Sequence, residues 1–334
     1  MTAPESELIN RIDSALRLPR EVSPEVRLRI GDDAALLRPR ARHEMILTCD
    51  WFLEGTHFLR KRHPPDSVGW KCLARALSDI AAMGGVPRCF LLSLALPDTH
   101  TGRWLDEFLA GLSRASRKFR CVLAGGDTTR CREISVNVTV VGEVETGRAV
   151  ARSGAGPGDL IYVSGRLGEA GLGLAVLRRG RGLPDPKNSL TKKHLYPEPR
   201  LALGQWLAEK RLASSMMDLS DGLSSDLLRL CAASGVGACL ESGTIPCLRT
   251  PDMAHKYGLD PLQLALHGGD DYELLFTVPR RKAKLVPHAF QSIPLTPIGQ
   301  IAKQSRLVLR DRNSREQLLA AGGWDPFRNS GCLA

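Results

Sequence analysis

The chain has 334 residues, of which 43% are hydrophobic and 25% charged, a composition typical of a globular protein with two domains or one large domain. The net charge of +10 permits nucleic-acid binding, but aromatic residues make up only 5% of the chain, so a platform for stacking bases is not expected and a nucleic-acid partner is unlikely. No apolar run approaches the roughly 18 residues of a membrane span, and the first ten residues lack a signal-peptide core, so we expect a cytoplasmic protein without a membrane partner.

The cysteines argue against two other classes of protein. There are nine, an odd number, and they are scattered without a Cys-x-x-Cys pair. This spacing disfavours a disulfide framework and a thiolate zinc site. We expect buried free thiols, except at Cys332 near the end of the chain, which we expect to be exposed.

Helices and strands alternate from the N-terminus, which predicts the α/β class with mixed sheets. Residues 31–37 have the pattern of a glycine turn that runs into a strand, and Gly125-Gly126 is expected to form a turn after a short strand. The residue pattern predicts helices over 5–18, 67–83 and 101–119, and strands over 44–50, 89–96, 121–124 and 134–144.

Residues 151–159 are rich in turn formers and are expected to connect two α/β domains, 1–148 and 149–334. In the second domain, residues 180–198 are the best candidate for a mobile loop. Strands are predicted over 160–164, 272–278, 294–301 and 307–310, and helices after Gly168 and over 199–211 and 224–233.

Short acidic clusters recur along the chain, most of them beside a glycine or a hydroxyl residue. Carboxylates that a fold brings together repel one another and tend to protonate. Mg²⁺ resolves that conflict, because it prefers oxygen ligands and bridges to substrate phosphates, and nearby glycines let backbone N–H groups approach a phosphate. The pattern therefore favours an enzyme that handles nucleotide phosphates with several Mg²⁺ ions. The clusters are Gly31-Asp32-Asp33, Thr48-Cys49-Asp50, Ser78-Asp79, Gly125-Gly126-Asp127-Thr128-Thr129, Asp218-Leu219-Ser220-Asp221-Gly222 and Gly268-Gly269-Asp270-Asp271.

Each cluster also has a structural explanation. Asp33 and Asp127 fit ordinary turns, and Asp50 fits the end of a strand. Asp218 and Asp221 fit the cap of a following helix. Asp79 lies on an otherwise apolar helix face, where a carboxylate is costly unless it binds a metal or pairs with a cation such as Arg75.

Two common phosphate-binding motifs are weak or missing. Gly165-x-x-Gly168-x-x-Gly171 follows a strand but lacks the Gly-x-Gly start of a dinucleotide-binding fingerprint. The sequence contains no Walker A motif. Phosphates must therefore be bound in another way.

Seven motifs in order make the chain resemble the thiamine-monophosphate kinases, of the aminoimidazole-ribonucleotide-synthetase superfamily. The resemblance runs from about residue 5 to residue 327. The motifs are Gly31-Asp32-Asp33-Ala34-Ala35, Thr48-Cys49-Asp50 with Glu54-Gly55-Thr56-His57-Phe58, 77–84, 125–129, 152–159, 218–223 and 268–274.

The resemblance implies ATP-dependent phosphorylation of thiamine monophosphate to thiamine diphosphate by direct in-line transfer. It also implies a two-domain ATP-binding fold and a homodimer formed through the sheet of the N-terminal domain. Carried over by position, the Mg²⁺ ligands are Asp33, Thr48, Cys49, Asp50, Asp79, Asp127, Asp218 and Asp221. ATP is expected at Gly126, Asp127, Arg152 and Ser220, and the substrate at His57, Asp270 and Trp324.

Three of these positions carry a qualification. Cys49 stands where relatives can have Thr, so a backbone carbonyl there serves as a ligand but a hydroxyl does not. Asp270 stands where relatives can have Glu, and its reach is one methylene shorter. Trp324 is expected to stack on a thiamine ring, or else to be a packing aromatic.

The second pKa of the acceptor phosphate is about 6, so no general base is required and the metal ions carry the chemistry. Two alternatives stay open. The first is another ATP-dependent enzyme of the superfamily, such as selenophosphate synthetase or the hydrogenase-maturation dehydratase, whose terminal reactive cysteine is not matched by Cys332-Leu333-Ala334. The second is a non-catalytic relative that binds nucleotide or RNA.

Overall fold

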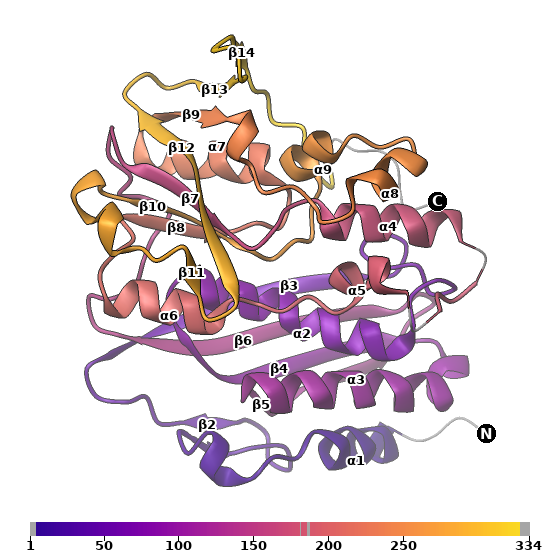
Figure 1. Cartoon of the computed structure of the whole chain (residues 1–334). Helices are drawn as coiled ribbons and strands as arrows, with labels where there is room; N and C mark the ends of the chain where they lie inside the picture. The colour runs from indigo at the N-terminus through magenta and orange to yellow at the C-terminus, as the bar shows by residue number, and fades with distance from the viewer. Residues whose placement is uncertain (1–4, 181, 186–187, 328–334) are drawn as a thin grey trace.

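Two sheets with helices packed against them make up the computed structural model, which describes residues 5–180, 182–185 and 188–327 (Figure 1). The sheet of the N-terminal half occupies the lower part of Figure 1 and that of the C-terminal half the upper part. Cys332 lies outside the described residues. In the described part, no helix combines the length and the apolar character that a membrane span requires.

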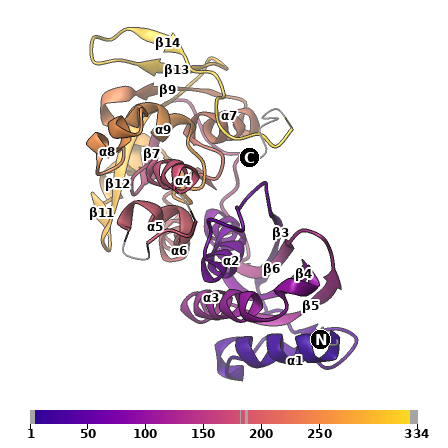
Figure 2. The same ribbon diagram turned by 90° about the vertical axis from the view of Figure 1, so that its right-hand side faces the viewer.

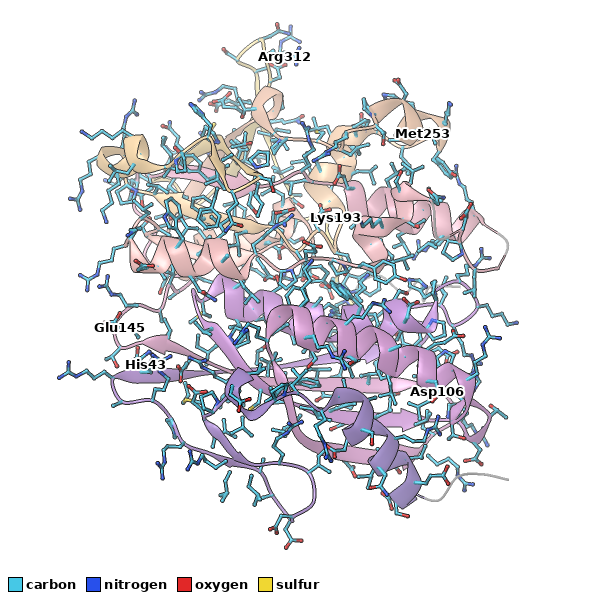
Figure 3. The ribbon with its side chains drawn as sticks, turned by 60° about the horizontal axis from the view of Figure 1, so that its bottom comes forward. His43, Asp106, Glu145, Lys193, Met253 and Arg312 are labelled. Carbon is cyan, nitrogen blue, oxygen red and sulfur yellow. The ribbon has the colours of Figure 1, made fainter. Side chains whose placement is uncertain are left out.

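The N-terminal sheet has the strand order β3-β6-β4-β5. Strand β6 is antiparallel to β3 and β4, whereas β5 is parallel to β4. His43 and Glu145, both labelled in Figure 3, face each other where β3 begins and β6 ends. The strands are β3 (His43–Leu53), β4 (Val86–Leu96), β5 (Val122–Arg130) and β6 (Ser135–Glu145), with a small β1–β2 pair (Val26–Leu28, Leu36–Leu37) beside them.

Helices α2 (Pro65–Ala82) and α3 (Arg103–Phe119) cover one face of this sheet, and α1 (Glu5–Leu16) lies beside α3 and the edge strand β5 (Figure 2). Helix α2 has a proline at its start, where the missing N–H costs nothing, and it is followed by Gly84 in the left-handed region. Its apolar side packs on alternate residues of the sheet, such as Phe52 and Phe90, to form the N-terminal core.

The alternating residues of β3 show that the helices cover only one face of the N-terminal sheet. Ile46 and Phe52 point to α2 and are buried, whereas the alternate residues Leu47 and Trp51 are 69% and 57% exposed. We call the side of the sheet opposite α2 the open face. Residues 22–37 cover the part of it near Cys89 and Val122.

The C-terminal sheet has the order β14-β13-β9-β12-β7-β10-β8, with β11 paired to β12. Most neighbours are antiparallel, and β13 is parallel to β9. The strands are β7 (Leu160–Ser164), β8 (Ser215–Asp218), β9 (Gly237–Glu241), β10 (Leu274–Val278), β11 (Ala289–Phe290), β12 (Ile293–Ala302), β13 (Leu307–Arg310) and β14 (Glu316–Leu318), and the helices are α4 (Glu169–Arg179), α5 (Ser189–Leu195), α6 (Leu201–Glu209), α7 (Leu223–Ser234), α8 (Pro251–Lys256) and α9 (Pro261–His267).

The two halves meet along α2. Ala81 and Ala82 of α2 share a buried cluster with Leu203 and Leu207 of α6. The indole Nε1 of Trp70 donates to the Pro197 carbonyl at 2.8 Å. Together, this buried cluster and this hydrogen bond hold the C-terminal half against α2. The candidate site lies in a cavity between the two halves.

The α/β class with mixed sheets is confirmed, and most predicted elements exist. The turn expected at Gly125-Gly126 is wrong, because β5 continues to Arg130 in parallel pairing with β4. The mobile loop expected over 180–198 is wrong where α5 lies, because Thr191, His194 and Leu195 of that helix are buried.

The sequence missed the strands β1, β8, β9, β11 and β14 and the helices α8 and α9, and it predicted more strand over 31–37 than β2 provides. The prediction of buried free thiols is confirmed at five cysteines but is wrong at Cys49 and Cys131, which are exposed. The five buried thiols are Cys72, Cys89, Cys121, Cys231 and Cys239.

Candidate functional site

A cavity of about 650 Å³ lies between the two halves, and we call it the central cavity. Strand β3 and helix α2 line it from the N-terminal half, and the loop after β8, the loop before β10 and the segment 322–326 line it from the C-terminal half. The predicted site residues that line it are Asp50, His57, Asp79, Asp218, Ser220, Asp221, Asp270 and Trp324.

Three carboxylates from both halves converge on this cavity: Asp50, Asp79 and Asp218, which we call the acidic group. Strand alternation turns Thr48 and Asp50 toward α2, where the Thr48 hydroxyl donates to Asp79 at 2.5 Å. Asp218 ends β8 and is 4% exposed. Burial, and then the charge of Asp50, raise the pKa of Asp79, and burial, and then the charge of Asp79, raise the pKa of Asp218. The acidic group is therefore strained by its own charge.

Cys49 lies apart from its neighbours in the chain. The side chain of Cys49 points to the open face, where its sulfur contacts Asn137 of β6 at 3.2 Å. Since Thr48 and Asp50 point the other way, the thiol of Cys49 is not brought into the acidic group. Asp50, the next residue, is the residue of β3 that lines the cavity.

The loop after β8 is held by a residue that the sequence analysis missed. Asp226, in the first turn of α7, accepts hydrogen bonds from the N–H groups of Ser220, Asp221 and Gly222 at 3.1, 3.0 and 3.1 Å. Burial and the neighbouring Asp221 raise the pKa of Asp226 to about 7. Arg229 pairs with Asp226 at 2.7 Å and with Asp221 at 2.5 Å. The sequence feature that could have indicated this role is an Asp in the first turn of a predicted helix, where a carboxylate can accept hydrogen bonds from unpaired backbone N–H groups.

His57 is arranged to donate a hydrogen bond rather than to take up a proton. Its Nδ1 accepts the N–H of Leu53 at 3.0 Å. Burial, and then the charge of Arg75, lower the pKa of His57 to about 4, so the ring is neutral near pH 7 and Nε2 carries the proton. This geometry suits a positioning role.

Asp270 is fixed by a cation from the other half. The ammonium of Lys71, a residue that is 1% exposed, lies 2.9 Å from Asp270, and the hydroxyl of Tyr272 donates to Asp270 at 2.7 Å. Burial alone would raise the pKa of Asp270, but the charges of Lys71, His194 and Arg75 outweigh it and hold that pKa far below its usual range. The sequence analysis missed Lys71, although a charged residue on the apolar face of α2 was the signal already used for Asp79.

Trp324 is placed at the cavity by backbone contacts. Its N–H donates to the Asp221 carbonyl at 2.9 Å, and the N–H of Gly323 donates to the hydroxyl of Ser225 at 3.1 Å. The segment 322–324 is thus tied to the loop after β8, and the indole of Trp324 lies on the same wall as Asp221.

Asp33, Gly126 and Asp127 line a different cavity of about 1020 Å³, between α1, residues 29–37 and strands β4 and β5. A Cβ on Gly126 would come within 1.9 Å of the Leu92 carbonyl, so the close pairing of β4 and β5 is sufficient reason for this glycine. Arg152 is exposed, and its charge acts on Asp79, which places it near the acidic group. The predicted ligands are thus divided between two cavities.

The acidic group fits a hard divalent cation by its chemistry, since its oxygen donors repel one another and the pKa values of Asp79 and Asp218 are raised. In the described part of the chain, however, no three His, Cys, Asp or Glu side chains already converge on one metal position. Both observations agree with Mg²⁺, which is commonly held by one or two carboxylates together with substrate phosphates and water.

Comparison with known proteins gives one family over most of the chain. Residues 31–144 match the AIR synthase related protein N-terminal domain, and residues 156–312 match the C-terminal domain of the same family. Thiamine-monophosphate kinase of Escherichia coli K12 is 39% identical over 307 residues, covering 91% of this chain and 93% of that protein.

Solved structures agree with this similarity. The crystal structure of thiamine-monophosphate kinase from Stenotrophomonas maltophilia has a TM-score of 0.79 at 35% identity, over 92% of this chain and 97% of that one. AaThiL complexed with AMPPCP and TMP has a TM-score of 0.76 at 32% identity, over 96% and 97%. The hydrogenase maturation protein HypE in complex with ATP has a TM-score of 0.77 at 19% identity, over 95% of each chain, which shows a shared fold alone.

Proposed function

Because this chain belongs to the AIR synthase related proteins and, among them, to the thiamine-monophosphate kinases, we propose that it transfers the γ-phosphoryl group of ATP to thiamine monophosphate in the central cavity. The observation that carries this proposal is the meeting of the acidic group with His57, Asp270 and Trp324 in one cavity between the two halves. Transfer between two polyanions requires positive charge and alignment more than a base.

Several Mg²⁺ ions bound at the acidic group would neutralise the phosphates and align the transferred group. We assign Asp50, Asp79 and Asp218 as ligands, with Thr48 orienting Asp79. The backbone of Cys49 and the carboxylate of Asp221 adjoin the same group. Asp33 and Asp127 retain their assignment on the resemblance.

On the nucleotide side we assign Gly126, Asp127, Arg152 and Ser220 to ATP. Ser220 is held in place by Asp226, and Arg152 contributes positive charge beside Asp79. The seven motifs support these assignments.

On the acceptor side, the protonated Nε2 of His57 would donate to the substrate. Asp270, kept ionised by Lys71, would face the positively charged thiamine. Trp324 would stack on one of the thiamine rings by a cation–π contact.

The expected domain boundary, 1–148 and 149–334, falls in the stretch without helix or strand between β6 and β7. We also propose a cytoplasmic location, where ATP is available.

An assay of ADP release with ATP and Mg²⁺ tests the function directly, with thiamine monophosphate, thiamine or no acceptor. We expect turnover with the monophosphate, little with thiamine, and loss of turnover on chelation with EDTA. ATP hydrolysis that does not depend on the acceptor would favour another activity of the superfamily. Salt-dependent RNA binding without turnover would favour the non-catalytic alternative.

We further propose that two copies pair through the open face of the N-terminal sheet. Met45, Leu47 and Trp51 of β3 are 38%, 69% and 57% exposed and form an apolar row along the open face, and Leu91 of β4, 38% exposed, lies on the same face beyond β6. Contiguous apolar surface of this kind is typical of an interface. Covering it with the same surface of a second copy would give a closed two-fold pair.

Leu47→Glu should convert the dimer to a monomer, because each copy would bury an unpaired charge in the interface. Light scattering after size exclusion should give twice 36.4 kDa for the wild-type chain and 36.4 kDa for the variant. Leu318→Glu, at a leucine of β14 that is 76% exposed, is the matched control and should stay dimeric. A monomeric wild-type protein would contradict the proposal.

A further inference from the structure

Arg75 is a cation at the centre of the site to which the resemblance assigns no role. It lies on α2 one turn before Asp79 and lines the central cavity. Its side chain is 15% exposed, and its guanidinium stands over the ring of Phe52, 5.3 Å from the centroid. This cation–π contact holds the guanidinium beside the aromatic ring.

The hydrogen-bonding capacity of Arg75 is incompletely used. A guanidinium carries five N–H donors, and Nε of Arg75 is buried without an acceptor among the described residues. The carboxylate paired with it, Asp50, lies 3.8 Å from Nη2, which is longer than a hydrogen bond. Because Nε is shielded from solvent, a ligand in the cavity reaches the Nη donors, where a further acceptor would stabilise the site.

Two other cations of the structure show the usual arrangement. Lys71 lies 2.9 Å from Asp270, and Arg200 makes two hydrogen bonds to Glu273, at 2.6 and 2.5 Å. Both are matched to a carboxylate at contact distance. Arg75 differs from them, although it is surrounded by acidic residues.

The acidic residues around Arg75 are engaged by other groups. Asp270 is held by Lys71 and Tyr272, Asp221 by Arg229, and Asp79 by the Thr48 hydroxyl. Arg75 is therefore a cation of the central cavity, beside the acidic group, whose Nη donors remain for a ligand. An anion there would sit between the acidic group and the acceptor side, where Arg75 also lies near His57.

We propose that Arg75 binds a phosphoryl group through the fork formed by the N–H donors of its Nη1 and Nη2. Arginine matches phosphate in this two-point manner, and a fixed positive charge at the transferred group offsets the charge between two polyanions. The inference rests on the proposed function and adds one phosphate-binding residue to it. The phosphoryl group belongs either to the γ position of ATP or to thiamine monophosphate, and binding measurements distinguish the two.

The test compares Arg75→Met, which removes the charge at similar length, with Arg75→Lys, which keeps the charge but loses the fork. We expect kcat/KM with thiamine monophosphate to fall about 10²- to 10³-fold in Arg75→Met and less in Arg75→Lys. Arg103→Met, at a residue whose side chain is 93% exposed on α3, is the matched control. If Arg75→Met fails to fold, Arg75→Lys carries the test, with an expected loss of at least about tenfold.

Calorimetry then identifies the source of the phosphate. If Arg75→Met binds thiamine monophosphate more weakly but thiamine as well as the wild type does, Arg75 contacts the phosphate of the acceptor. If it binds a non-hydrolysable ATP analogue more weakly but ADP as well as the wild type does, Arg75 contacts the γ-phosphoryl group. Either result supports the proposal. Wild-type affinities for all four ligands together with wild-type kcat/KM in Arg75→Met would overturn it. If the wild-type protein did not phosphorylate thiamine monophosphate, the proposed function would fail, while the analogue titration would still test the phosphate site.

Discussion

Asp79→Asn and Asp218→Asn should each lower kcat by about 10²- to 10³-fold, the loss expected when one group that stabilises charge in the transition state is removed. Asparagine keeps the size of the side chain and its capacity to accept the Thr48 hydrogen bond, but it loses the negative charge that holds a divalent cation. The measurement is ADP release at saturating ATP and thiamine monophosphate over a range of Mg²⁺ concentrations. Both variants should also require more Mg²⁺ for half-maximal activity.

The same substitutions should not destabilise the metal-free protein. Asp79 and Asp218 raise the free energy of the folded state by mutual repulsion and burial, which is why their pKa values are raised. Neutralising one of them removes this repulsion, so the Tm measured in EDTA should stay the same or rise. An activity loss together with an unchanged or higher Tm separates a role in binding phosphate and metal from misfolding.

Two further variants calibrate this result. His57→Ala should lower kcat much less, because a neutral imidazole that donates one hydrogen bond positions the substrate without bearing the transferred charge. Asp106→Asn, at a side chain that is 65% exposed on α3, should behave as wild type. Small and equal effects from Asp79, Asp218 and His57 would reject the acidic group as the site of transfer.

Local sequence patterns predicted the parts of the site that local structure positions. The alternation of β3 implies that Thr48 and Asp50 share a face, and the apolar helix around Asp79 implied that its carboxylate needs a partner. The same alternation implies that the Cys49 side chain points away from Asp50, so treating 48–50 as one ligand group ignored the pleat of the strand.

Residues that act through long-range contacts were not predictable from the sequence alone. Lys71 and Asp270 are 199 positions apart, and they meet only because α2 packs against the C-terminal half. The separation of Asp33 and Asp127 from the acidic group has the same origin. Residues 22–37 pack on β4 and β5, on the open face, whereas Asp50 and Asp79 point to the other side of that sheet.

The motif 268–274 shows how one short stretch serves several purposes. Asp270 points to the central cavity, whereas Asp271 accepts the N–H groups of Gly168 and Ala170 at the start of α4, at 2.6 and 3.1 Å. Glu273 points into the interior and is fully buried. The sequence analysis assigned only Asp270 a role, because nothing local distinguishes the three carboxylates.

Glu273 joins three elements of the C-terminal half. Its carboxylate accepts two hydrogen bonds from Arg200, one from Lys193 and one from the Ser164 hydroxyl at 2.6 Å. Lys193 of α5 is labelled near the centre of Figure 3. Gly165 follows β7 with φ +63°, and a Cβ there would come within 2.3 Å of the Glu273 carboxylate. The first glycine of the Gly165-x-x-Gly168-x-x-Gly171 pattern is thus explained by the approach of this carboxylate rather than by a dinucleotide.

Glu273→Gln should therefore lower the free energy of unfolding by about 3–5 kcal/mol, because it leaves two partly buried cations without their counter-charge. Urea unfolding measures the change. Glu198→Gln is the matched control: Glu198 is 52% exposed and pairs with Lys118, and its loss should cost less than about 1 kcal/mol. Adding Arg200→Met to Glu273→Gln should recover part of the loss, since one unpaired cation is then removed as well.

The pH dependence distinguishes lost charge from lost packing. Burial alone would raise the pKa of Glu273, but Lys193 and Arg200 outweigh it and lower that pKa below its ordinary value of 4.5. A lowered folded-state pKa stabilises the fold above the ordinary value, and this contribution is lost as the pH falls below it. The difference in unfolding free energy between wild type and Glu273→Gln should be constant from about pH 6 to 8 and should shrink below about pH 4.5. A difference that stayed constant down to pH 3 would mean that the glutamine disturbs packing around Gly165 and Ser164, and that the charge of Glu273 does not hold α5 and Arg200 in place.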